Sequence, residues 1–410
     1  MNFVFVSPNF PPNWYLFCVR LREAGANVLG IGDAPFHELR PELQQALSEY
    51  YRVDDMNSYD QLVRALGHLT HRHGKLDRID SLNEYWLETE ARLRTDFNIP
   101  GIKNSDIARM KRKSLMKRLF ERSGLRVGRG RVCRSPRAVR EFIGLVGYPV
   151  VAKPDAGVGA AATYKLENDE DVRRFLVEKP AIDYILEEFL DGQLLTYDGL
   201  TNRRGEVVFG SSFYYSQGVM EAVNDDTDIW YCITRQVPPD VEAAGKAIIR
   251  AFRVRERPFH FEFFRLADGS VVPLEINVRP PGGLTVDMFN FANEFDFYRE
   301  WANVLVQGRF DAALTRPYAC LYVGRKHRLS YARSHEDVIR EFRPMIVFDT
   351  PMSGVFARAI GDFGYILRDP DEAKLVAAAL AIQEKAPSPR GASKPVRRAP
   401  VAVEAVRARR

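Results

Sequence analysis

Two carboxylates and an amide in the second half of the chain have the types and spacing of a magnesium site. Glu275 and Asn277 are two residues apart in an apolar stretch, so on a strand their side chains face the same side. Asp268-Gly269 predicts a hairpin, which would bring Glu262 close to Glu275. Facing carboxylates repel each other unless a cation lies between them, and Mg²⁺ prefers carboxylate and amide oxygens.

Arg279 continues the same two-residue period and extends the chemistry of this stretch. Its planar guanidinium can hold a phosphate or a carboxylate, and Gly282 and Gly283 let backbone N–H groups approach an anion. The alternative is a pair of surface acids on a solvated hairpin. Three aromatic residues favour a buried sheet instead: Phe261, Phe263 and Phe264.

A second segment could bind a polyphosphate. An apolar strand over 150–153 ends in Lys153, and a loop of small residues, 155–162, follows it with Gly157 and Gly159. The amides of such a loop can close over phosphates while the lysine supplies a point charge. The loop has no GK[ST] and no third glycine, so it is neither a Walker A loop nor a dinucleotide fingerprint. Taken alone, Lys153 is equally well explained as an ordinary residue at a strand end.

Two more segments gain meaning only beside the others. The strand 185–189 ends in Glu187 and Glu188, followed by Phe189 and Leu190. An adenine needs an acceptor, a backbone N–H and apolar walls, which this segment could supply; exposed acids at a strand end are the alternative. Lys113 lies in a basic helix, and a basic helix is more often a solvated face than a binding site.

The order of these residues resembles the ATP-grasp superfamily, in particular carboxylate–amine ligases of the carbamoyl-phosphate synthase, biotin carboxylase and amino-acid ligase type. The resemblance covers roughly residues 1–383. It includes the helix 86–93 ahead of Ile99-Pro100-Gly101 and a closing segment, 359–367. The motif Glu275-x-Asn277-x-Arg279 is its specific part, because the lysines are not diagnostic alone.

The resemblance implies the cofactors ATP and Mg²⁺, with Mn²⁺ as a substitute. Glu262, Glu275 and Asn277 would hold the metal, and Arg279 and Lys153 would act in catalysis. Lys113, Lys153 and the loop with Gly157 and Gly159 would contact the phosphates. Glu187 would accept a hydrogen bond from the adenine amine. The remaining nucleotide-binding positions are Glu188, Phe189, Leu190, Phe264 and Leu274. One position departs from the pattern: Leu194 stands where the family commonly has an acid for the ribose, with Asp191 or Asp198 as replacements.

The implied function is ligation of a carboxylate, activated as an acyl phosphate, to an amine, with release of ADP and phosphate. A carboxylase or kinase acting on bicarbonate or a single small substrate is one alternative, and a nucleotide-binding regulatory protein without turnover is another. The expected partners are small carboxylates and amines and a second copy in a homodimer, with neither membrane nor nucleic acid. Candidates for a substrate loop are Tyr214, Tyr215, Trp230 and Arg235.

The elements that must position these residues predict an α/β protein. Alternating strands and helices over 1–105 predict a small doubly wound domain, which the resemblance implies to be a Rossmann-like pre-ATP-grasp domain. A two-lobed α+β ATP-grasp domain is expected over 106–310, beginning with a helix over 107–123 and including a lid subdomain at about 120–190. The part 311–383 would complete that fold, and a disordered basic tail is expected over 384–410.

Charge and composition exclude several other classes. The net charge is +5, but the segment from Ala386 to the end carries seven Lys or Arg residues and one Glu, which leaves the body slightly acidic. The high isoelectric point therefore gives no argument for nucleic-acid binding by the body. Four scattered cysteines and the lack of a signal or long apolar segment predict a cytoplasmic protein. We interpret His68, His71 and His73 as an exposed helix end rather than a zinc site, and Asp225, Asp226 and Asp228 as a solvated loop.

Overall fold

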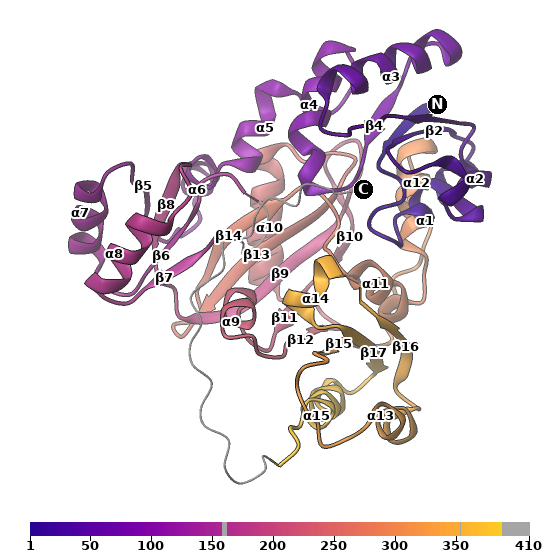
Figure 1. Cartoon of the computed structure of the whole chain (residues 1–410). Coiled ribbons are helices and arrows are strands. Elements are labelled where there is room, and N and C mark those ends of the chain that lie inside the picture. The colour runs from indigo at the N-terminus through magenta and orange to yellow at the C-terminus, as the bar shows by residue number, and fades with distance from the viewer. Residues whose placement is uncertain (158–161, 353, 388–410) are drawn as a thin grey trace.

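The chain folds into three sheets with helices packed around them (Figure 1). The computed structural model describes residues 1–157, 162–352 and 354–387. Gly159 and most of the predicted tail therefore lie outside the described residues. The α/β fold class predicted from the sequence is confirmed.

The N-terminal sheet is parallel, with the strand order β3-β2-β1-β4. Its central strands are buried apolar runs because helices cover both faces. This is the alternating pattern that the first hundred residues predict. The strands are β1 (Asn2–Val6), β2 (Asn27–Gly32), β3 (Glu49–Arg52) and β4 (Arg78–Asp80), and the helices are α1 (Tyr15–Glu23), α2 (Pro41–Ala46), α3 (Tyr59–His73) and α4 (Leu87–Asp96).

The small sheet is antiparallel, with the order β5-β8-β6-β7, and it projects from one side of the molecule (Figure 1). Two amphipathic helices bury Val139, Phe142 and Phe175 in a core of its own with Tyr184. The region lies within the stretch expected to form the lid. Its elements are β5 (Gly130–Val132), α7 (Pro136–Val146), β6 (Val150–Pro154), β7 (Tyr164–Leu166), α8 (Asp169–Glu178) and β8 (Tyr184–Glu188).

The large sheet has nine strands in the order β14-β13-β9-β11-β12-β15-β17-β16, with β10 paired to β9. Its strands run from residue 192 to residue 369, so the expected division at residue 310 falls between strands of one sheet. The strands are β9 (Gly192–Thr201), β10 (Val207–Ser211), β11 (Phe213–Tyr215), β12 (Trp230–Ile233), β13 (Pro258–Leu266), β14 (Val271–Asn277), β15 (Ala319–Arg325), β16 (Ile346–Pro351) and β17 (Phe363–Asp369). The helices of this part are α9 (Val219–Asn224), α10 (Pro239–Phe252), α11 (Thr285–Asn293), α12 (Phe297–Val306), α13 (His335–Phe342), α14 (Gly354–Ile360) and α15 (Glu372–Ile382).

The single helix expected over 107–123 is wrong, because two helices, α5 (Asn104–Lys111) and α6 (Lys113–Arg122), meet at Arg112. Arg112 has an extended backbone and forms a bridge with Ala156, beside the end of β6. Asp155 then caps α6: its carboxylate accepts from the Ser114 N–H at 2.8 Å, and its carbonyl accepts from the Lys113 N–H at 2.8 Å. The break between α5 and α6 is therefore fixed by Asp155, which follows β6 of the small sheet.

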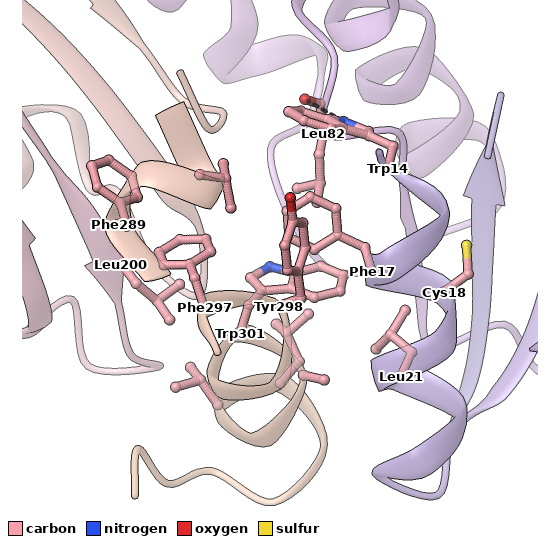
Figure 2. Close-up of a cluster of buried hydrophobic side chains, with 14 of the residues drawn as sticks. Trp14, Phe17, Cys18, Leu21, Leu82, Leu200, Phe289, Phe297, Tyr298 and Trp301 are labelled. Atoms are coloured by element: carbon pink, nitrogen blue, oxygen red, sulfur yellow. Dashed lines mark hydrogen bonds between the residues drawn. The ribbon is translucent and has the colours of Figure 1, made fainter. Parts of the chain in front are cut away.

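An aromatic interface joins the N-terminal sheet to the large sheet. Figure 2 shows α1 packed against α12, with Phe17 pointing toward Tyr298 and Trp301. The Phe17 ring centroid lies 4.7 Å from that of Tyr298 and 5.0 Å from that of Trp301. Trp14 anchors the other end of the cluster by donating from Nε1 to the carbonyl of Leu82 at 3.2 Å. The two sheets thus share one hydrophobic core.

Candidate active site

A cavity of about 540 Å³ lies between the small and large sheets. This volume is in the range of small-molecule sites. Its lining includes almost every residue selected from the sequence, together with Glu84 from the N-terminal part of the chain. The selected residues in the lining are Lys113, Lys153, Glu187, Glu188, Phe189, Leu190, Glu262, Phe264, Leu274, Glu275, Asn277 and Arg279.

The hairpin of β13 and β14 brings the candidate metal ligands together. Glu262 and Glu275 are direct partners in the antiparallel register, and the turn uses Gly269 at a φ of 81°. Asn277 follows on β14 and is buried. Two facing carboxylates beside an amide oxygen form a hard oxygen donor set, so these residues fit Mg²⁺. The sequence prediction of their proximity is confirmed.

Each of these carboxylates has a cationic neighbour. Lys113 Nζ lies 3.0 Å from Glu275 Oε1, and His260 Nε2 lies 3.3 Å from Glu262 Oε1. Burial opposes the charge on His260, but Asp198, with Oδ1 2.7 Å from Nδ1, and Glu262 raise the histidine pKa to about 9. Burial likewise opposes the charge on Lys113, while Glu275 raises the lysine pKa. These cations offset the negative charge of the donor set.

The hinge, the connection 189–191 between β8 of the small sheet and β9 of the large sheet, lies next to a buried charge cluster. Glu187 on β8 contacts Lys153 Nζ at 2.6 Å and Lys117 Nζ at 2.9 Å, and all three side chains are buried. Burial raises the pKa of Glu187, yet the two lysines outweigh it and bring the pKa down to about 2. Each carboxylate oxygen thereby has a lysine nearby, but Oε1 accepts no hydrogen bond within the described residues. The predicted contact of Glu187 with an adenine amine stays a prediction, and Glu187 positions Lys153 in this structure.

Lys117 is a site residue that the sequence analysis did not single out. It lies one helical turn after Lys113 on α6, so both ammonium groups reach the same cavity. Lys117 also donates to the carbonyl of Gly128 at 2.8 Å. The spacing of four residues between the two lysines was the available sequence signal.

Apolar side chains line the end of the cavity next to the hinge. Leu194 lies there, at the position where an acid was expected. Asp198 does not take its place, because Asp198 is fully buried and paired with His260. Asp191 is in the lining and stays available. The apolar residues at this end are Val151, Leu190, Leu194, Phe264 and Leu274.

Glu84 is the second site residue that the sequence analysis missed. It follows β4 and places its carboxylate 2.9 Å from Arg279 Nη2 and 3.1 Å from Lys111 Nζ. Burial raises the pKa of Glu84, but Arg279 and Lys111 together lower it to about 2. Nothing near Glu84 in the sequence signals this role, because its partners lie 27 and 195 residues away.

Some sequence-selected residues lie elsewhere. Gly157 is not in the cavity lining. The proposed substrate loop is wrong in three of its four members: Tyr214 donates to Glu372 at 2.8 Å, Trp230 packs in the core under α15, and Arg235 donates to the carbonyl of Arg316. For Tyr214 and Trp230 the reason is strand alternation, which turns neighbouring side chains to opposite faces of the sheet. Tyr215 does line the cavity.

Two other clusters are structural. His68 and His73 both lie within hydrogen-bonding distance of the Glu49 carboxylate, at 2.5 and 2.7 Å. The interpretation of residues 225–228 as a solvated loop is wrong for Asp228, whose carboxylate accepts from Tyr331 at 2.8 Å and also contacts Lys385. The acidic segment therefore fastens the chain near its described C-terminal end.

Comparisons with known proteins agree with this geometry. The sequence profile of the ATP-grasp domain matches residues 146–287, which include β8, the hinge and the β13–β14 hairpin. This chain has the ATP-grasp fold. None of the curated proteins compared with it matches in sequence. The structure is similar to that of an L-amino acid ligase from Bacillus licheniformis. The two chains are 14% identical in sequence and superpose with a TM-score of 0.70, and the match covers 93% of this chain and 96% of that one.

Two further solved structures with this fold carry nucleotides. One is N5-carboxyaminoimidazole synthetase from Staphylococcus aureus complexed with ADP, with 13% identity, a TM-score of 0.70 and coverage of 93% and 97%. The other is the biotin carboxylase domain of a Hydrogenobacter thermophilus 2-oxoglutarate carboxylase with MgADP and bicarbonate, with 15% identity, a TM-score of 0.66 and coverage of 94% and 90%. Within the described part of this ATP-grasp chain, the helices are too short or too polar to cross a membrane.

Proposed function

We propose that this ATP-grasp chain is an ATP-dependent carboxylate–amine ligase that works with Mg²⁺. One observation carries the proposal: Glu262 and Glu275 face each other across the hairpin and line one cavity. Asn277 and Arg279, which follow Glu275 in the chain, line the same cavity. Such a set can hold a metal and a transferring phosphoryl group together. The residues present at the hinge can hold a purine nucleotide.

The hinge would take the base and the lysines the phosphates. Apolar side chains such as Leu194, Phe264 and Leu274 offer walls to a purine ring. Glu187 Oε1 is buried and accepts no hydrogen bond within the described residues, so it could accept from an adenine amine. Lys113 and Lys153 would neutralise the phosphates of the nucleotide.

The reaction has two steps, and in each step one bond forms while another breaks. A carboxylate oxygen attacks the γ-phosphorus as the bond to ADP breaks. The neutral amine then attacks the acyl carbon as the bond to phosphate breaks, and the proton lost from nitrogen leaves with the phosphate. Arg279 would stabilise charge on the phosphoryl oxygens in both steps. Bound Mg²⁺, held by Glu262, Glu275 and Asn277, supplies charge neutralisation to the phosphates.

The solved structures support ligation in general and leave the reaction open. Their names include an amino-acid ligase, which joins a carboxylate to an amine, and enzymes that act on bicarbonate. We place the ligase first because the cavity lining next to Arg279 also includes Tyr231, Phe356 and Ile360, apolar groups that a bicarbonate ion would not need. A carboxylase remains the second candidate.

The test is release of ADP and phosphate from Mg-ATP over pooled carboxylates, each with and without pooled amines. Glu275→Ala is measured beside Glu206→Ala, an acid that is exposed and outside the cavity. Release that needs both pools and drops at least about 100-fold in Glu275→Ala alone supports a ligase.

Two results would contradict this function. Release that depends on bicarbonate would point to a carboxylase. Failure of the wild-type protein to bind Mg-ATP in isothermal titration would remove the basis of any ATP-dependent reaction.

A further inference from the structure

The cavity widens into an aromatic compartment next to Arg279. The loop 281–283 follows Arg279 directly and forms one wall. Three rings from the large sheet form another: the centroid of Phe213 lies 5.3 Å from those of Tyr215 and Tyr231, and Tyr215 lies 5.5 Å from Tyr231. All three residues line the cavity.

Helix α14 extends the lining beside the loop 281–283. Phe356 lies against Gly282, where an added Cβ would come within 3.5 Å of its ring. Ile360 lies against Gly283 at 3.0 Å from such a Cβ, and the Tyr231 hydroxyl lies at 3.6 Å. Phe356, Ala359 and Ile360 all line the cavity. Apolar groups therefore bound the compartment from two directions.

The charged groups at this end already have partners. Arg279 is paired with Glu84, which is also held by Lys111. His260 lies between Asp198 and Glu262, and its ring is stacked on Phe213 at 5.9 Å. The lysines among the described residues of the cavity lining are likewise paired: Lys113 with Glu275, and Lys117 and Lys153 with Glu187. A ligand with a second anionic group would have to compete with one of these carboxylates for its cation.

Resting on the proposed function, we propose that the activated substrate is a monocarboxylate that bears an apolar group about the size of an aromatic ring. Its carboxylate would lie at Arg279, and its apolar group would lie among Phe213, Tyr231, Phe356 and Ile360. Tyr215 also lines the cavity, beside Phe213 and Tyr231.

This ligand class differs from that of several structurally similar proteins. Three of them are named as ribonucleotide or ribosylglycinamide synthetases, whose ligands carry a phosphate. A phosphate needs cationic or amide donors, and within the described residues of this compartment the cations Arg279 and His260 are already paired with carboxylates, which leaves the N–H groups of Gly282 and Gly283. The aromatic walls of this chain favour an apolar ring instead.

The test measures binding without turnover. Isothermal titration is done on the full chain with Mg²⁺ and a non-hydrolysable ATP analogue, using 3-phenylpropionate and phenylalanine against succinate and glutamate. We expect each phenyl compound to bind at least about ten-fold more tightly than its acidic counterpart. Equal or tighter binding of the acidic compounds, or no binding of either phenyl compound at millimolar concentration, would overturn the proposal.

A pair of variants locates the effect. Phe356→Ala should weaken binding of 3-phenylpropionate about five-fold and leave the affinity for the ATP analogue unchanged. Phe348→Ala is the matched control, because this phenylalanine is exposed on β16 and outside the cavity. An unchanged affinity in Phe356→Ala would contradict the assigned compartment.

This experiment separates the two proposals. If the phenyl compounds bind more tightly but the pooled assay shows no ADP release, the assignment of the aromatic compartment stands and the ligase function is rejected. ADP release stimulated only by acidic or phosphorylated carboxylates would retain the ligase function and reject the compartment.

Discussion

Glu187 shows how one buried carboxylate can organise a binding site. It lies between Lys117 and Lys153, which come from α6 and β6 on either side of the hinge. Removing one member of such a buried cluster is costly, because the remaining charges have no water to stabilise them. The two lysines are thus held apart and in place before any phosphate arrives.

Glu187→Gln should destabilise the protein by about 3 kcal/mol, because two buried ammonium groups lose their counter-charge. Urea unfolding followed by circular dichroism measures the change. Glu188→Gln is the matched control: Glu188 is the next residue and pairs with the half-exposed Arg129, so its loss should cost at most about 1 kcal/mol. Equal effects in the two variants would contradict a special role for Glu187.

The low pKa of Glu187 also predicts how stability depends on pH. Its pKa of about 2 lies below the ordinary glutamate value of about 4.3, so the folded state gains stability from its ionised form. This contribution is complete above the ordinary value and is lost as the pH falls toward 2. The free energy of unfolding in urea should therefore fall less between pH 6 and pH 3 in Glu187→Gln than in the wild type or Glu188→Gln. An identical fall in all three proteins would argue against the depressed pKa.

At the scale of elements, the start of α6 depends on Asp155, the residue that follows β6 of the small sheet. Asp155 caps its first turn through the Ser114 N–H and hydroxyl, at 2.8 and 3.1 Å. Since α6 carries Lys113 and Lys117, the cap also sets where their ammonium groups lie. The start of the helix and the position of the small sheet are therefore coupled.

Asp155→Ala should cost about 1–2 kcal/mol and weaken Mg-ATP binding, because α6 loses its cap and its lysines lose their fixed position. Asp155→Asn should retain most of the stability, since asparagine is also a good N-cap. Urea unfolding and isothermal titration measure the two effects. Stability in Asp155→Ala equal to that of the wild type would contradict the capping role.

The elements predictable from the sequence are those with local signals. The hairpin at Asp268-Gly269 and the buried run of β1 follow from turn residues and apolar patterning, and the hairpin fixes Glu262 opposite Glu275. The break at Arg112 and the role of Glu84 could not be predicted, because Asp155 and Arg279, which determine them, are distant in sequence. The face that Trp230 takes depends on sheet register, which its own sequence leaves open.

At the scale of the molecule, the N-terminal sheet and the large sheet share a core. Trp301 on α12 packs edge-on against Phe17 of α1 and Phe3 of β1. A shared core predicts that both parts unfold together. Arg257 adds a buried ion pair across the same boundary, with Nη1 in contact with Asp80.

Trp301→Ala should lower the stability by about 3–5 kcal/mol through loss of a fully buried ring, in a single unfolding transition. Far-ultraviolet circular dichroism in urea measures the midpoint and the number of transitions. Phe36→Ala is the control, because this ring is 45% exposed. Separate transitions for the two sheets would contradict the shared core.

The reach of Glu84 into the cavity has a consequence for how such chains can recombine. A crossover near residue 105 would exchange the first sheet and leave Arg279 facing a foreign residue in place of Glu84. Only a donor that supplies an acid at the same place would restore the pair. The N-terminal segment can therefore be exchanged only together with an acid at this place, even though the ATP-grasp sequence profile matches only residues 146–287.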